Sequence, residues 1–145
     1  MAMPRFAECK EKELGSRRYR CFFDLALMVI GGKWKPRILG SLAEHKVLRF
    51  GELRRSIHGI TERMLVLQVR ELEADGLVTR RVLDVVPPHV EYSLSELGET
   101  LIPVLKVLRD WGESFERHIV GDAYVAEEGF EPHSCRAKAR GDGKV

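Results

Sequence analysis

Two hydrophobic periods alternate along the chain, and their order predicts an α+β fold that is mostly helical. Residues 21–30 are nearly all apolar, and apolar residues at helical spacing predict helices over residues 34–44, 51–57, 62–74 and 96–118. Residues 77–86 and 90–94 are rich in β-branched or alternating residues, which predicts a hairpin with Pro87-Pro88 at its tip. A short strand near residues 48–50 can add to this hairpin.

Helix, tight turn, helix and hairpin follow one another over residues 50–94. This order is typical of a winged helix-turn-helix, a unit that reads double-stranded DNA. His58-Gly59 supply the turn, and Thr61 is a favourable N-cap for the second helix. We therefore expect the second helix to enter the major groove and the hairpin to contact the adjacent minor groove or backbone.

The second helix predicts where bases are read. Leu65, Val69 and Leu72 lie within roughly 60° of one another on a helical wheel and form its core face. The side chains that face away from this core are Arg63, Val66, Leu67 and Arg70. Arg63, near the helix start, is the candidate for a bidentate contact to guanine. Two exposed aliphatic side chains are unusual on a solvated surface and less unusual on one that contacts DNA, but a protein interface explains them nearly as well.

Charge is unevenly distributed along the chain. The net charge is only +2, but residues 33–70 carry nine Lys/Arg against three Glu, whereas residues 71–120 carry five Lys/Arg against ten Asp/Glu. The first of these parts attracts phosphate. Other side chains predicted to contact DNA are Lys33, Lys35, Arg49, Arg54, Arg55, Thr61, Arg80, Arg81 and His89. For His89, an ordinary solvated residue at a loop tip is an equal alternative.

A long amphipathic helix is predicted near the C-terminus, with an apolar stripe over about four turns. The preceding helices and hairpin already supply a core. We therefore expect this stripe to pack on the same helix of a second subunit, helped by the apolar residues 22–30. Folding back onto its own core is the alternative. The predicted dimerisation residues are Leu25, Met28, Leu101, Val104, Leu105, Leu108, Trp111 and Phe115.

Composition and length predict one folded domain over residues 21–120 of the 145-residue chain. Residues 1–20 lack a sustained apolar period and are expected to be a mobile extension, and residues 121–145 a flexible tail. No apolar run reaches the length of about 18 residues that spans a membrane, and the N-terminus is too charged for a signal peptide. We expect a cytoplasmic protein with no membrane partner.

The sequence contains no recognisable catalytic or metal-binding pattern. Cys9, Cys21 and Cys135 have neither CxxC spacing nor a neighbouring His/Cys cluster, which argues against a structural zinc or a disulfide framework. There is no nucleophile and base pair and no phosphate-cradling glycine loop. We expect no enzyme activity, no cofactor and no metal.

Four motifs resemble those of one family. They read LxxIGGKWKPxIL from Leu27, RFGELRRxIxGIxxRML from Arg49, RELExDGLVxR from Arg70 and VPPxVEYSLxELG from Val86. Over residues 21–118 the chain resembles the HxlR-type winged helix-turn-helix regulators of bacteria and archaea, which are related to the MarR group. The resemblance implies a homodimer joined through its N- and C-terminal helices that binds a pseudo-palindromic operator.

The resemblance also singles out Cys21. In some members of the family a cysteine at the start of the domain senses oxidants or electrophiles, and Cys21 stands at that position, although Phe22 replaces the proline that often follows. Thiol oxidation is therefore a candidate signal beside a small-molecule effector. An inert buried thiol is the alternative, and a sensor requires nearby positive charge such as Arg18 or Arg20. Val66 and Leu67 depart from the commoner polar pattern of the recognition helix, so the base preference does not carry over.

Two functions fit these observations. The first is a sequence-specific DNA-binding transcription regulator that acts as a homodimer. The alternative is a winged-helix protein-interaction module without specific DNA binding, since residues 21–120 carry 14 Lys/Arg and 14 Asp/Glu. Salt dependence separates the two, because DNA-binding proteins lose affinity steeply as phosphate contacts exchange with counterions.

Overall fold

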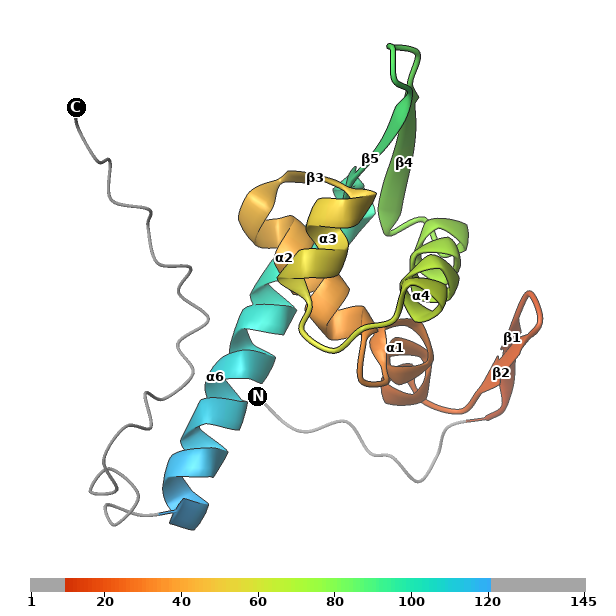
Figure 1. Ribbon diagram of the computed structural model, residues 1–145. Helices are drawn as coiled ribbons and strands as arrows, with labels where there is room; N and C mark the ends of the chain where they lie inside the picture. The colour runs from red at the N-terminus through yellow and green to blue at the C-terminus, as the bar shows by residue number, and fades with distance from the viewer. Residues whose placement is uncertain (1–9, 121–145) are drawn as a thin grey trace. The chain divides into compact units, whose positions relative to one another are not determined.

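The computed structural model describes residues 10–120 of the chain (Figure 1). The strands are β1 (Lys12–Leu14), β2 (Arg17–Tyr19), β3 (Val47–Arg49), β4 (Val78–Leu83) and β5 (His89–Leu94). The helices are α1 (Phe22–Ile30), α2 (Lys35–His45), α3 (Phe50–Ser56), α4 (Glu62–Ala74), α5 (Glu96–Glu99) and α6 (Ile102–Val120). The predicted α+β class is confirmed, and the predicted tail of residues 121–145 lies outside the described residues. The chain divides into two compact units inside α6, between Val107 and Leu108.

One hydrophobic core lies within the unit that ends at Val107. Its most buried side chains come from α2, α3 and α4 and are at most 2% exposed: Ile38, Leu39, Leu42, Leu53, Leu65, Val69 and Leu72. They recur at the spacing of one helix face, so each helix turns one apolar side toward a common interior. The predicted core face of α4 is confirmed, and Trp34 is partly buried against the same core.

β3, β5 and β4 form an antiparallel sheet in that order, as expected for a short strand that joins the hairpin. Val47 lies opposite Ser93, and β4 pairs with β5 from Val78 opposite Leu94 to Leu83 opposite His89. The β4–β5 hairpin is the wing, which projects from the helices in Figure 1. β4 ends at Leu83 and not at residue 86 as predicted, because the prolines of the tip cannot donate ladder hydrogen bonds.

Residues 12–19 form a hairpin, which the sequence did not predict, since residues 1–20 were expected to be a mobile extension or one that folds only on a partner. β1 and β2 are antiparallel, with Lys12 opposite Tyr19 and Leu14 opposite Arg17. Gly15 has a φ of +59°, a left-handed conformation that glycine adopts at little cost and that closes the tight turn. Strands this short and polar have no sustained alternation, so periodicity could not reveal them.

The single helix predicted over residues 96–118 is in fact two helices. α5 ends at Glu99 and α6 begins at Ile102. Pro103 has no N–H to donate to the Glu99 carbonyl, and proline is tolerated in the first turn of a new helix but not inside a continuous one. Ser95 is the N-cap of α5, and its hydroxyl accepts a 3.0 Å hydrogen bond from the Gly98 N–H.

Gly98 lies at a point where no side chain fits. It is buried, and a Cβ built on it would lie 2.1 Å from the carbonyl oxygen of Leu77. Because that obstacle is backbone, a larger residue must push α5 away from the residues that lead into β4.

Gly98→Ala should therefore lower the free energy of unfolding by about 1–3 kcal/mol, the usual cost of overpacking. Gly40→Ala in α2 is the matched control, because nothing lies within 4 Å of a Cβ there. Alanine at that helical position should stabilise by about 0.5–1 kcal/mol. Urea unfolding followed by circular dichroism measures both variants, and a Gly98→Ala protein as stable as the wild type would contradict the tight contact.

Candidate nucleic-acid interface

α4 is fixed at both ends. At its start the Thr61 hydroxyl accepts a 3.2 Å hydrogen bond from the Met64 N–H, which is the predicted capping contact. At its end Gly76 has a φ of +75°, a left-handed conformation that terminates helices. Because one face of α4 is buried in the core, the helix cannot rotate about its axis, and the directions in which its other faces point are fixed.

The face of α4 that the sequence assigns to base reading is open at its start and centre. Arg63 and Arg70 are exposed, and Leu67 is 50% exposed. Among residues 10–120, neither arginine side chain has a hydrogen-bond or ion-pair partner. Both guanidinium groups are therefore available to a ligand from solvent.

A hollow lies between α4 and the wing. Its volume is about 520 Å³, and it is lined by Phe50, Glu62, Val66, Val69, Arg70, Glu73, Arg80 and Tyr92. Val66 is half-buried in this lining, and it is not among the side chains that pack against the core. Arg70 and Arg80 bring positive charge to the hollow, and Glu62 and Glu73 bring negative charge.

Basic side chains also surround α3. Arg49, Arg54 and Arg55 are exposed. The backbone N–H of Arg49 donates a 2.8 Å hydrogen bond to the Glu52 carboxylate at the start of the helix. The guanidinium groups of Arg54 and Arg55 have no partner within the described part of the chain. The structure thus leaves cations on the α3 side of α4 free to meet phosphate.

The wing carries its positive charge on β4. Arg80 and Arg81 are exposed, and in the strand register Arg81 lies opposite Glu91. His89 begins β5 and does not lie at the loop tip as predicted. It is half-buried, with Nε2 3.7 Å from Oε1 of Glu91.

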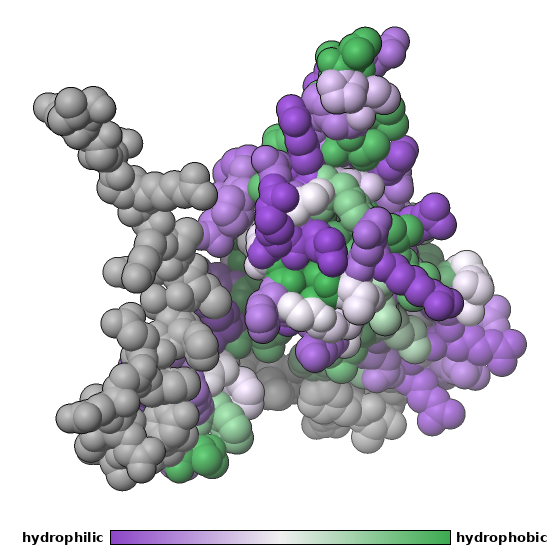
Figure 2. Space-filling view, in the orientation of Figure 1, coloured by the Kyte–Doolittle hydropathy of each residue, from purple (hydrophilic) through white to green (hydrophobic). Residues whose placement is uncertain are grey.

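The tip of the wing is apolar. Val85 and Val86 are exposed there, beside Asp84. Figure 2 shows the hydrophobic colour at the end of the wing, beyond the hydrophilic residues that gather lower down. Within the wing, the exposed positive charge thus lies on β4 and not at the tip.

The predicted phosphate contact of Lys35 is wrong. Its side chain is 9% exposed, and its Nζ lies 2.8 Å from Oε2 of Glu71. The ammonium group forms an ion pair that joins α2 to α4, and drawing it toward DNA would leave buried charge unpaired. Lys33 remains exposed, with its Nζ 4.6 Å from the centre of the Trp34 ring.

Residues 29–119 match the family model described as HxlR-like helix-turn-helix. The chain belongs to the HxlR family. It is 42% identical over 118 residues to an uncharacterised HTH-type transcriptional regulator of Methanothermobacter thermautotrophicus, and the match covers 81% of this chain and 89% of that protein.

Solved structures of HxlR and MarR regulators share the fold. The redox regulator HypR in its oxidised form is 51% identical with a TM-score of 0.61, over 65% of this chain and 96% of HypR. A MarR-family regulator from Enterococcus faecalis V583 is 38% identical with a TM-score of 0.61, over 75% of this chain and 98% of that one. The chain is accordingly a helix-turn-helix transcriptional regulator, a class that binds DNA and does not catalyse a reaction.

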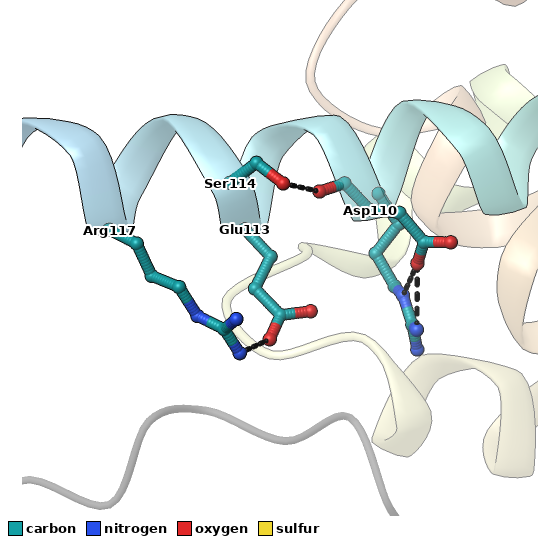
Figure 3. A network of polar contacts seen from close by, with 5 residues as sticks. Asp110, Glu113, Ser114 and Arg117 are labelled. Carbon is teal, nitrogen blue, oxygen red and sulfur yellow. Dashed lines mark hydrogen bonds and ion pairs between the residues drawn. The ribbon is translucent and has the colours of Figure 1, made fainter.

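In this HxlR chain α6 carries an exposed apolar stripe. Its exposed members are Val104, Val107, Leu108, Trp111, Phe115 and Ile119, and the Trp111 and Phe115 rings stack with their centres 5.3 Å apart. Leu101 and Leu105 pack against the core of their own subunit, so the fold-back alternative holds for these two. Several polar residues of α6 bond within the helix: Figure 3 shows Ser114 donating to the Asp110 carbonyl and Arg117 paired with Glu113.

α1 is apolar and largely uncovered. Phe22, Phe23, Leu27 and Met28 are exposed, while Leu25 is half-buried. Monomeric soluble proteins rarely expose an apolar face of this kind to water.

Cys21 is the N-cap of α1. Its Sγ accepts a hydrogen bond of 3.5 Å from the Asp24 N–H, and the Asp24 carboxylate accepts bonds from the N–H groups of Cys21 at 3.1 Å and Arg20 at 3.2 Å. These bonds, the one from Cys21 foremost, hold the pKa of Asp24 below its ordinary value, so the carboxylate is ionised at neutral pH. The free thiol is half-buried, and Cys9 and Cys135 lie outside the described residues.

Within residues 10–120, no helix is long and apolar enough to cross a membrane, and no group of three or more His, Cys, Asp or Glu side chains could hold a metal ion. Sequence reasoning missed two ion pairs of α4, Lys35 with Glu71 and Arg17 with Asp75. Both join residues of different elements, and no local pattern could have revealed them.

Proposed function

We propose that this HxlR chain is a homodimeric transcription regulator that recognises a specific double-stranded DNA sequence. α4 enters the major groove, and the wing lies on the adjacent minor groove or backbone. The observation that carries the proposal is the exposed, unpaired Arg63 near the capped start of α4. An arginine in that place can bond the two acceptors on the major-groove edge of guanine.

Free cations on both sides of α4 support the same orientation. Arg49, Arg54 and Arg55 lie on the α3 side, and Arg70, Arg80 and Arg81 lie on the side of the wing. The phosphate backbones border a groove on both sides, so cations that flank the reading helix are suited to hold it in register. Lys33, Thr61 and His89 remain candidates for further contacts, and Val66 and Leu67 for contact with a thymine methyl group or sugar.

A protein-interaction module is the second candidate function. It is favoured by Leu67, an aliphatic side chain that is half exposed at the centre of the α4 face. Such a contact would depend little on salt, whereas a DNA contact through several arginines would weaken steeply as salt rises.

Arg63→Ala should weaken operator binding by about 1–3 kcal/mol and binding to scrambled DNA much less, because the lost bonds are to bases. Fluorescence anisotropy on DNA from upstream of the gene and on its scrambled version, across a salt series, measures both. Arg81→Ala is the control: loss of a phosphate contact should weaken both DNAs equally and reduce the salt slope by about 1. Equal losses for Arg63→Ala would remove it from base reading, and weak, salt-insensitive wild-type binding would favour the interaction module.

We propose that α6 supplies the dimer contact, through Val104, Leu108, Trp111 and Phe115. These side chains form an apolar stripe on a helix in which several polar residues bond among themselves. In a homodimer with two-fold symmetry, the same stripe meets itself, and apolar area is removed from water on both copies. The exposed face of α1, with Met28 and the half-buried Leu25, is the second surface that we assign to this contact.

Trp111→Glu should convert the dimer to a monomer, because it places a charge in the apolar contact. Light scattering after size exclusion should then give 16.6 kDa, the mass of one chain, in place of twice that mass. Lys106→Glu adds the same carboxylate to an exposed position off the stripe and should leave the dimer intact. A Trp111→Glu protein that still has two subunits would refute α6 as the dimer contact.

We propose oxidation of the Cys21 thiol as the signal, with a small-molecule effector as the alternative. The half-buried thiol lies beside the exposed Arg20, and HypR, to which this chain is similar, is a redox regulator. A substituent on Sγ would disturb the hydrogen bond from the Asp24 N–H and loosen the first turn of α1.

Cys21→Ser tests this signal without removing the cap, because serine is a favourable N-cap. The variant should bind DNA as the wild type does, and mild peroxide should change the affinity of the wild type but not of Cys21→Ser. A double variant with Cys9→Ser and Cys135→Ser should keep the response. If Cys21→Ser still responds to peroxide, Cys21 is not the sensor.

A further inference from the structure

The β1–β2 hairpin contacts the reading helix directly. It lies before residues 29–119, the part of the chain that matches the family model. Arg17 of β2 places its Nη2 2.6 Å from Oδ1 and 2.8 Å from Oδ2 of Asp75, a residue 58 positions later. The hairpin is thus tied to the end of α4 by a charge-assisted contact to both carboxylate oxygens.

Asp75 needs such a partner. It is the C-cap of α4, and its side chain is only 10% exposed. A carboxylate there lies at the negative end of the helix dipole and has lost most of its hydration, so an opposite charge must compensate for it. Arg17 supplies that charge.

A second cation holds the preceding turn of α4. Glu71 and Asp75 are four residues apart and lie on the same side of the helix. Lys35 of α2 binds Glu71 at 2.8 Å, and Arg17 of β2 binds Asp75. The C-terminal half of α4 is therefore attached both to the core helix α2 and to the N-terminal hairpin.

The hairpin is itself attached to α1. The Tyr19 and Phe22 ring centres are 6.4 Å apart, and the Lys12 ammonium lies 4.6 Å from the Phe22 ring centre. These contacts place β2 against the start of α1, directly before Cys21. The position of Arg17 is thus set by folded structure and not by a free chain end.

We propose that Arg17 is a positioning residue for DNA reading: by holding Asp75 it fixes the C-terminal end of α4, and the β1–β2 hairpin thereby raises operator affinity. The inference rests on the proposed function, since it assumes that α4 reads DNA. It adds to that function a positioning contact that touches no base.

The chain offers a matched control in the neighbouring residue. Arg18 lies on the same strand but pairs at 3.1 Å with Glu13 on the surface of the hairpin, where both side chains are well exposed. Arg17→Ala and Arg18→Ala each remove one positive charge, so their long-range effects on DNA are alike. Any difference in operator affinity between the two variants is therefore due to the contact between Arg17 and Asp75.

Arg17→Ala should weaken operator binding roughly 3- to 30-fold, the range expected for a residue that acts through another element, and Arg18→Ala should leave it nearly unchanged. The charge swap Arg17→Asp with Asp75→Arg should recover most of the affinity lost in Arg17→Asp alone, because the pair is rebuilt in reverse. Equal affinities of Arg17→Ala and Arg18→Ala, with no rescue by the swap, would overturn the proposal.

Hydrogen exchange of the free full-length chain gives a readout that needs no DNA. Arg17→Ala should speed exchange of the amides at residues 74–77, at the end of α4, whereas Arg18→Ala should not. If the wild type shows no sequence-specific binding, the proposed function fails, and exchange still tests the anchor. If exchange at these amides is the same in both variants, the anchor itself fails.

Discussion

Complete burial of one face of α4 is the constraint on which the rest of this structure depends. Leu65, Val69 and Leu72 are at most 2% exposed, and they fix the rotation of the helix about its own axis. A helix that could roll would present a changing set of side chains to a groove. Because this one cannot roll without exposing its core residues to water, Arg63 and Leu67 stay on the outside. The same packing that stabilises the fold therefore selects the residues that can read DNA.

The two halves of α4 differ in whether their charged side chains are paired. The N-terminal part carries Arg63, unpaired within the described residues, whereas Glu71 and Asp75 near the other end are neutralised by Lys35 and Arg17. Without those partners, two carboxylates near the end of the reading helix would repel phosphate. Lys35 and Arg17, which form these internal ion pairs, thus improve the electrostatics of the proposed DNA interface without contacting DNA themselves.

Local patterns predicted the reading helix well. The spacing of Leu65, Val69 and Leu72, with Thr61 before and Gly76 after them, sufficed to place α4 and its buried face, because caps and periodicity act over a few residues. The same reasoning was wrong for Lys35, which looked like one more cation in a basic cluster. Its burial depends on Glu71 on another helix, just as the hairpin contact depends on Asp75. Pairs of this kind form only when the chain is folded, and a single sequence carries no trace of them.

Among residues 10–120, the order β3-β5-β4 leaves β4 with one side unpaired along its length. An open strand edge is a template on which another chain can add, and natural sheets often protect such edges with charged side chains. Arg80 and Arg81 are exposed on this edge strand between Val78 and Val82. Charge at these two positions opposes edge-to-edge association, so apolar replacements chosen to study DNA contacts should make the protein more prone to aggregate.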